Sequence, residues 1–170
     1  MSKLFVDSIE PKTTGGDISL NGTLAASLNN TPAFKATLSS NQTIADDTLT
    51  RVAWDTEIYD TNNAFASNVF TVPSGQGGIY VFEFHIFGDD IDDTDTWNAY
   101  LELDGVKVVG SLAQNTGAQN GMNCLLNNTV TVTVTAGQVV EVVTKQQGTN
   151  ASQAIRSTDS FFSGYKLIGV

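Results

Sequence analysis

The chain of 170 residues has few of the side chains that build covalent cross-links or catalytic centres, with one cysteine and one histidine. A single cysteine, Cys124, excludes a disulfide within the chain and a metal cluster built from several cysteines. Hydrophobic residues make up 41% of the chain, which is enough for a core in a domain of this size. We therefore expect one domain that folds without cross-links.

Basic residues are also scarce, with 8 Lys and Arg against 18 Asp and Glu and a formal net charge of −10. Nucleic-acid affinity depends on basic side chains that neutralise phosphates, so we expect no nucleic-acid partner. Charged residues are only 15% of the chain. Much of the polar surface must then come from Asn, Thr, Ser and Gln, and the acidity is best interpreted as a source of solubility.

Long apolar runs are missing as well. The opening residues Met1–Asp7 lack the apolar stretch of a signal peptide, and no window approaches the length of a membrane span. We expect a protein that is synthesised in a cytoplasm, stays soluble and has no membrane partner.

What the chain does have is alternation of polar and apolar residues, and no long stretch shows the 3.6-residue period of a helix. In Thr129–Thr135 the valines fall on one face and the threonines on the other. The turn signals Ala136-Gly137 and Asp104-Gly105 separate strands that we expect to form hairpins. The pattern predicts an all-β fold with strands at Ile79–Phe87, Ala99–Leu103, Val106–Val109, Thr129–Thr135, Val139–Val143 and Phe161–Val170.

The character of the sequence changes near Thr31-Pro32. Before this point come turn-rich pairs of Gly and Asn and two short apolar alternations, Leu4–Ile9 and Asp17–Leu20. After it, strand-like runs recur at the short spacing of a sandwich or barrel. We predict an N-terminal anchoring arm at residues 1–31 and a single domain at residues 32–170.

Motifs in this domain follow a recognisable order. They are Ala33-Phe34-Lys35-Ala36, then Phe70-Thr71-Val72-Pro73 with Gly78-Ile79-Tyr80-Val81-Phe82, then Ala136-Gly137-Gln138-Val139-Val140, and last Phe161-Phe162-Ser163-Gly164-Tyr165-Lys166-Leu167. Together they resemble the jelly roll shared by the globular heads of complement component one q and tumour necrosis factor. Two features depart from that family: Gln138 replaces an aspartate, and the tight Pro-Gly turn is expanded.

The resemblance implies a jelly-roll β-sandwich that forms a homotrimer, with aromatic residues packed between the subunits. The strand Ile79–Phe87 fits this, because its second face carries Val81, His85 and Phe87, which a monomer would expose at a cost. We expect the trimer interface to include Tyr80, Phe82 and Phe84, or the opposite face of their strand, together with Tyr165.

The opening segment Val6–Gly22 has a resemblance of its own. It is similar to stretches that recur in fibre and capsid-associated proteins of tailed phages. This resemblance implies a virion protein whose arm contacts another virion component. The residues that we expect to anchor the arm are its apolar side chains, Leu4, Phe5, Val6, Ile9, Ile18 and Leu20.

Catalytic chemistry is sparse. The one histidine, His85, lies within an expected strand, and Cys124 has no basic neighbour in sequence that would activate its thiol. Spacings typical of a nucleophile elbow, a phosphate-binding loop or a zinc site are absent from the sequence. We expect that the protein is not an enzyme and needs no cofactor.

Carboxylates are concentrated in one place, directly after the strand Ile79–Phe87. The group consists of Asp89, Asp90, Asp92, Asp93 and Asp95. A solvated acidic loop is the simpler interpretation, but oxygen ligands in this density could also contribute to a Ca²⁺ site. The spacing differs from that of an EF-hand, which has a glycine at the sixth position and a closing glutamate.

Four aromatic residues, Trp54, Tyr59, Phe65 and Trp97, leave two interpretations open. They could form a surface on which a host glycan stacks, or they could pack in the core. Core packing is favoured by the alternation of Val52, Trp54 and Ile58 with polar neighbours.

These observations lead to one main hypothesis, a structural protein of a tailed-phage virion. A trimeric domain would decorate or cement the capsid surface, anchored to the major capsid protein or another virion protein by arms that add strands to exposed sheet edges. It would be synthesised in the host cytoplasm. The alternatives are the receptor-binding tip of a phage fibre, which could bind a host glycan, and a secreted ligand of the tumour-necrosis-factor type.

Overall fold

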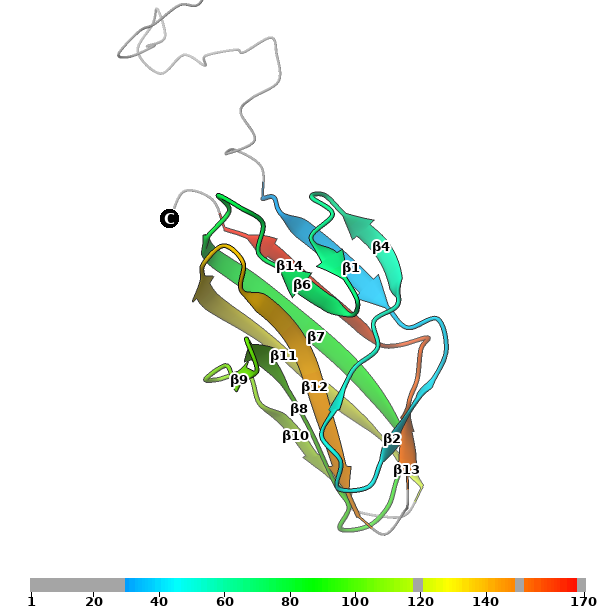
Figure 1. Cartoon of the computed structure of the whole chain (residues 1–170). Helices are drawn as coiled ribbons and strands as arrows, with labels where there is room; N and C mark the ends of the chain where they lie inside the picture. The colour runs from blue at the N-terminus through cyan, green and yellow to red at the C-terminus, as the bar shows by residue number, and fades with distance from the viewer. Residues whose placement is uncertain (1–29, 118–120, 149–151, 168–170) are drawn as a thin grey trace, which may run out of the picture.

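The computed structural model describes residues 30–117, 121–148 and 152–167. Within these ranges the chain forms strands and no helix, so the all-β prediction is confirmed. Two antiparallel sheets, each with seven strands, pack face to face as a sandwich (Figure 1). The described residues contain no helix with the length and hydropathy that a membrane crossing requires.

The first sheet is organised around one long central strand, β7 (Gly78–Ile91). In order across this sheet lie β2 (Gln42–Ala45), β13 (Ser152–Ile155), β7, β14 (Phe161–Lys166), β1 (Ala33–Thr37) and β4 (Thr56–Asp60), and β11 (Met122–Val134) pairs with the other edge of β7. Because β7 pairs with three strands, it joins the whole sheet.

The second sheet covers the inner face of the first. Its strands are, in order, β10 (Ala113–Thr116), β8 (Thr96–Leu103), β12 (Val139–Gln147), β6 (Val69–Thr71) and β5 (Phe65–Ala66), with β3 (Thr50–Arg51) paired to β12 and β9 (Val106–Lys107) paired to β8. The hairpin predicted around Asp104-Gly105 is confirmed, with Leu103 opposite Val106. Both turn residues have positive φ, which glycine and aspartate tolerate better than most residues do.

The predicted faces of Thr129–Thr135 are also confirmed. Val130 and Val134 are buried, whereas Thr129, Thr131 and Thr133 are exposed. The predicted hairpin between this segment and Val139–Val143 is wrong, because β11 pairs with β7 and β12 pairs with β8, β6 and β3. The turn at residues 135–138 therefore carries the chain from one sheet to the other.

A cluster of aromatic rings fills the space between the sheets. Phe34 of β1 lies at its centre, with ring centroids of Phe65, Phe70 and Phe162 within 4.9 Å. These rings come from both sheets, and all of them are at most 4% exposed. Stacked and edge-to-face pairs of this kind stabilise the packing of the two sheets by more than the burial of apolar area alone.

Candidate functional site

The outer face of the first sheet carries the side chains of β7 that point away from the core. Val81, His85 and Phe87 are half-buried there and Glu83 is exposed. His85 stands opposite Phe161 of β14, and their rings stack with centroids 5.6 Å apart. The amine of Lys35 lies 4.2 Å from the centroid of the Phe161 ring. Apolar and aromatic groups thus cover a sheet surface that a monomer exposes to water.

Two tyrosines extend this face across the neighbouring strands. Tyr165 of β14 is opposite Val81 and 39% exposed, and Tyr59 of β4 is opposite Lys35 and 47% exposed. We use the name "outer face" for this surface, which consists of Ala33, Lys35, Tyr59, Val81, Glu83, His85, Phe87, Phe161, Ser163 and Tyr165. Large side chains with one apolar part and one polar tip are typical of protein interfaces.

The structure corrects the first set of predicted interface residues. Tyr80, Phe82 and Phe84 are 0% exposed in a single chain, because they point between the two sheets, where Tyr80 and Phe82 pack against Phe70 and Phe82 also packs against Phe162. Burial raises the pKa of Tyr80 to about 12, and its hydroxyl donates a hydrogen bond to the carbonyl oxygen of Gln76 at 2.7 Å. These three residues cannot contact another subunit.

The alternative, that the opposite face of this strand forms the interface, stays a prediction, as does the role of Tyr165. Sequence reasoning overlooked Phe161, the aromatic partner of His85. The signal was present, because alternation through β14 places Phe161 and Tyr165 on one face and Phe162 on the other.

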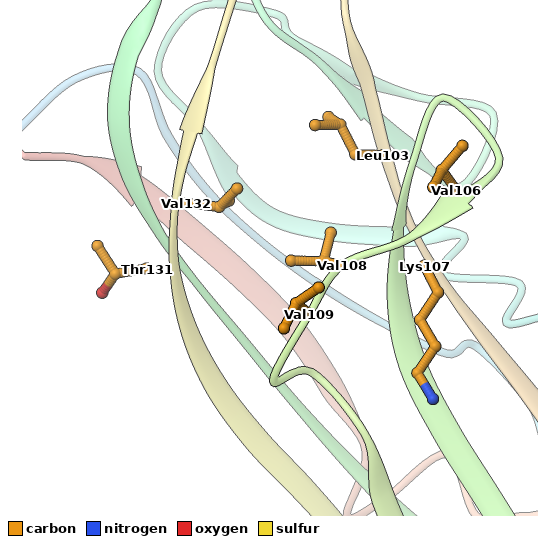
Figure 2. Close-up of a pocket in the computed structure, with 7 residues that line it drawn as sticks. All are labelled: Leu103, Val106, Lys107, Val108, Val109, Thr131 and Val132. Atoms are coloured by element: carbon orange, nitrogen blue, oxygen red, sulfur yellow. The ribbon is translucent and has the colours of Figure 1, made fainter.

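A second surface lies at the free edge of this sheet. Among the described strands, β11 pairs only with β7. On its other edge, Asn128 donates hydrogen bonds from Nδ2 to the carbonyl oxygens of Gly110 and Leu112, and the part of this edge beyond Asn128 has no strand partner among the described residues. Next to this edge is a pocket of about 340 Å³, lined by Leu103, Val106, Lys107, Val108, Val109, Thr131 and Val132. Figure 2 shows Val132 of β11 facing Leu103 and Val108 across the pocket. Five of these seven lining residues are apolar.

The segment on the other side of this pocket, Val106–Val109, exposes apolar side chains that are usually buried. Val109 is 94% exposed, Val106 is 69% exposed, and Leu112 nearby is 43% exposed. The segment Val106–Val109 was predicted only as a returning strand, and the structure ends β9 at Lys107. Consecutive valines without alternation were the available signal that some of them could not be buried.

The structure separates the one cysteine of the chain from its one histidine. Cys124 of β11 is 2% exposed and points into the core opposite Gly88, whereas His85 points to the outer face. Burial raises the pKa of the Cys124 thiol to about 12, so at neutral pH the sulfur carries its proton and is a poor nucleophile. These two side chains cannot act together.

The acidic segment is not a loop in its first part, because β7 continues through Ile91 and contains Asp89 and Asp90. Asp89 forms an ion pair with Arg156, with Nη2 and Oδ1 2.7 Å apart, and the Arg156 guanidinium lies 5.3 Å from the ring centroid of Phe87. This pair connects β7 to the segment after β13. The first of the predicted calcium ligands therefore has a basic partner from a distant part of the chain.

Two further carboxylates of this segment are used in local structure. Asp95 is 1% exposed and accepts hydrogen bonds from Nε2 of Gln153 at 3.0 Å and from the amide of Asp92 at 3.3 Å. Asp92 accepts a hydrogen bond from the amide of Gly121 at 3.0 Å. Among the described residues, no three Asp, Glu, His or Cys side chains meet as metal ligands. The side chain of Asp90 lies outside the described part of the structure, and among the other predicted calcium ligands, Asp89, Asp92, Asp93 and Asp95, no three meet as ligands of one ion.

The structure also does not bring together the four aromatic residues considered as a sugar-binding surface. Trp54, Phe65 and Trp97 are at most 4% exposed, so for them the core interpretation is confirmed. Trp97 donates a hydrogen bond from Nε1 to the hydroxyl of Thr144 at 2.7 Å. Tyr59 is the exception and belongs to the outer face. The alternation that placed Ile58 inside is wrong, since Ile58 is 58% exposed.

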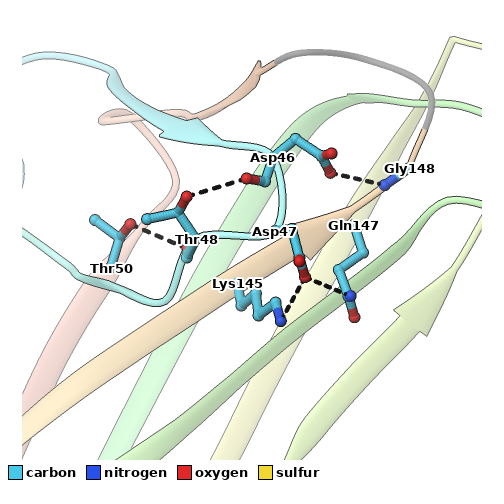
Figure 3. A network of polar contacts seen from close by, with 7 residues as sticks. All are labelled: Asp46, Asp47, Thr48, Thr50, Lys145, Gln147 and Gly148. Carbon is cyan, nitrogen blue, oxygen red and sulfur yellow. Dashed lines mark hydrogen bonds and ion pairs between the residues drawn. The ribbon is translucent and has the colours of Figure 1, made fainter.

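A polar network ties the turn after β2 to the end of β12 (Figure 3). One carboxylate oxygen of Asp47 lies 2.6 Å from both Nζ of Lys145 and Nε2 of Gln147, and Asp46 accepts a hydrogen bond from the amide of Gly148. The bond from Lys145 lowers the pKa of Asp47. These contacts fix the turn against the second sheet and are structural.

Comparison with known proteins agrees with this architecture. The model of the C1q domain family matches residues 33–167. The chain belongs to the C1q domain family. Domains of this type are binding or structural modules rather than enzymes. No curated protein matches the chain in sequence.

Solved structures of C1q and TNF domains have the same fold. The globular domain of zebrafish complement 1qA protein is 14% identical with a TM-score of 0.57, over 80% of this chain and 97% of that one. Murine APRIL at pH 5.0 is 13% identical with a TM-score of 0.58, over 79% and 98%. Eiger TNF from S. frugiperda is 12% identical with a TM-score of 0.53, over 81% and 93%. The predicted jelly roll of the C1q and TNF type is thus confirmed.

Proposed function

We propose that the chain is a structural protein of a tailed-phage virion, which forms homotrimers that decorate or cement the capsid surface. The observation that supports trimer formation is the outer face, where aromatic and aliphatic side chains gather on one sheet surface of a single chain. The C1q family to which the chain belongs supports self-association. The proposed role needs no cofactor.

Trimer formation requires two surfaces on each copy, because a closed ring joins one surface of a subunit to a different surface of the next. The outer face supplies one of them. The other is the first part of the edge strand β11, where Met122 is 37% exposed and Leu125, which borders the outer face opposite Phe87, is 45% exposed. Contact between the two would remove both apolar surfaces from water, which is the main favourable term in association.

The trimer is tested by a charge placed in the centre of the outer face. Val81 is half-buried between Thr131 and Tyr165, and in Val81→Asp a buried contact would have to accommodate an unpaired carboxylate. We expect the unchanged protein to be a trimer and Val81→Asp to be a folded monomer by light scattering and circular dichroism. Thr71→Asp, on an exposed position of the second sheet, should remain a trimer.

Two outcomes would contradict this interface. If the unchanged protein is a monomer, the trimer does not exist in solution. If Val81→Asp is still a trimer, the subunits meet through another surface.

The capsid contact is assigned to the arm residues Leu4, Phe5, Val6, Ile9, Ile18 and Leu20, which lie outside the described residues. The proposal rests on the resemblance of residues 6–22 to phage virion proteins and on the alternation typical of segments that add a strand to an exposed edge. In a trimer, three arms would bind together, so weak single contacts can give firm attachment.

Deletion of residues 1–22 tests the capsid role. We expect the truncated protein to remain a folded trimer that no longer binds expanded capsids in a sedimentation assay with the phage's major capsid protein. Unchanged capsid binding would refute the proposed anchoring. Binding of the truncated trimer to host cells, in place of capsids, would favour the receptor-binding fibre tip and a glycan ligand instead.

A further inference from the structure

The pocket beside β11 has the geometry of a site for an added strand. Thr131 points to the exposed side of the first sheet and Val132 points inward, yet both line the pocket. Successive side chains of a strand point to opposite faces, so a pocket lined by both lies at the edge of the strand. That edge is open among the described strands, because β11 pairs only with β7.

The chemistry of the pocket selects an apolar occupant. Leu103, Val108 and Val132 form its floor, and Val106 and Val109 stand at its rim with 69% and 94% of their surface exposed. An open strand edge provides backbone donors and acceptors, and an apolar pocket beside it receives alternate side chains. The fitting ligand is a short extended peptide with aliphatic residues two positions apart.

The chain itself contains such a peptide before the described residues begin. Asp17-Ile18-Ser19-Leu20 has aliphatic residues at two alternate positions and is bounded by Gly15-Gly16 and Asn21-Gly22, which are turn signals. We propose that residues 17–20 add a strand to the free edge of β11, with Ile18 and Leu20 inserted in the pocket. This inference goes beyond the proposed function, because it requires neither a phage nor a capsid.

The register of the first sheet places the start of the described chain in line with this pocket. Ala33 is opposite Tyr165, Tyr165 is opposite Val81, and Val81 is opposite Thr131. The row crosses three strand spacings, about 14 Å. The residues between Leu20 and Asn30 span about 33 Å when extended, so the segment reaches the pocket of its own chain or that of an adjacent copy.

Hydrogen exchange followed by mass spectrometry tests the added strand in the full-length protein. In the unchanged chain, amides in residues 130–134, beside the pocket, should exchange at least about tenfold more slowly than in the double variant Ile18→Asp/Leu20→Asp, because a paired strand edge is protected. The matched control is Leu4→Asp/Val6→Asp, which changes the other apolar alternation of the arm and should leave this protection intact.

Two results of this experiment would overturn the proposal. Equal exchange in the unchanged protein and in Ile18→Asp/Leu20→Asp would mean that residues 17–20 do not cover the edge. Equal loss of protection in Leu4→Asp/Val6→Asp would mean that the protection of β11 does not depend on residues 17–20 in particular. Circular dichroism confirms that the jelly roll itself is folded in each variant.

A disulfide between the segment and the pocket identifies whose pocket is filled. In Leu20→Cys/Val109→Cys, mild oxidation should give a rapid cross-link, whereas the exposed control pair Leu20→Cys/Thr158→Cys should not; Cys124 is buried and does not compete. A cross-linked single chain on a non-reducing gel places the segment in its own pocket, and a ladder of linked chains places it in that of a neighbouring copy. Cross-linking no faster than in the control pair would refute the proposal.

Discussion

Removal of the Phe34 ring tests whether the aromatic cluster holds the two sheets together. Phe34 is 1% exposed, and its ring lies 4.8–4.9 Å from the rings of Phe65, Phe70 and Phe162 and 6.4 Å from that of Phe82. Phe34→Ala deletes the one ring that contacts all four. The surrounding rings come from different strands in both sheets, so they cannot close the cavity without moving a strand.

The size of the effect follows from the buried ring and the cavity it leaves. Phe-to-Ala changes in cores cost about 3–5 kcal/mol of unfolding free energy. Folded domains are stable by only about 5–15 kcal/mol, so this is a large share of the total. With an unfolding entropy of about 2.1 cal/mol/K per residue over a domain of roughly 135 residues, a loss of about 4 kcal/mol lowers the Tm by about 14 °C.

Urea unfolding and differential scanning calorimetry measure this loss, at one fixed protomer concentration because the Tm of an oligomer depends on concentration. The control is Lys35→Ala, the next residue of the same strand, which points to the outer face. It loses a cation–π contact with Phe161 that is worth about 0.5–1 kcal/mol. A loss below about 1 kcal/mol in Phe34→Ala, or equal losses in both variants, would refute this account of the core.

Three further predictions concern other parts of the chain. Gly88→Ala should lower the unfolding free energy by about 1–3 kcal/mol in urea titrations, because its Cβ would lie 2.4 Å from Trp97 Cζ3 and 2.5 Å from Cys124 Sγ. Cys124 should stay unlabelled by iodoacetamide at pH 8 until the protein unfolds, because burial raises its pKa to about 12. Asp55 accepts two hydrogen bonds from Ser39, which lower its pKa, so this carboxylate stabilises the fold above its unfolded value of 3.8 and loses that effect as the pH falls further. The stability difference between the unchanged protein and Asp55→Ala should therefore be largest near neutral pH and vanish in acid, as pH-dependent melting would measure.

The sequence predicts the strands of this fold better than their partners. Alternation in Thr129–Thr135 identifies both the strand and its buried face, since that information is local. Nothing local distinguishes a turn within one sheet from a turn between two sheets. The pattern therefore predicts a hairpin at residues 135–138, although β11 and β12 lie in different sheets. The motifs of the C1q family supplied the jelly-roll topology that the alternation alone did not.

The choice of face in β7 shows a second limit of alternation. Both faces of this strand are apolar, so the pattern alone does not decide which one a single chain buries. The structure places the row of Tyr80, Phe82 and Phe84 inside, where the rings of Phe70 in the second sheet and Phe162 in β14 pack against it. Glu83 interrupts the other row. A charged residue in one row was the available signal that this row faces outward.

The acidic segment could not be interpreted from its own residues, because its partners are distant in the chain. Asp89 pairs with Arg156 and Asp95 pairs with Gln153, 67 and 58 residues further along. Composition identified a concentration of negative charge, and only the fold reveals that two of these carboxylates are engaged by β13 and the segment after it. Partners of this kind turn an apparent ligand cluster into structural contacts.

The two ends of β11 carry different contacts in these proposals. Met122 and Leu125, at its beginning, are exposed on the side that we assign to the neighbouring subunit, and Thr131 and Val132, near its end, line the pocket that we assign to residues 17–20. From Leu125 to Thr131 the strand extends about 20 Å, which separates the two contacts. An arm held at the second site leaves Leu4–Ile9 available for another protein, so one arm can both brace the trimer and attach it.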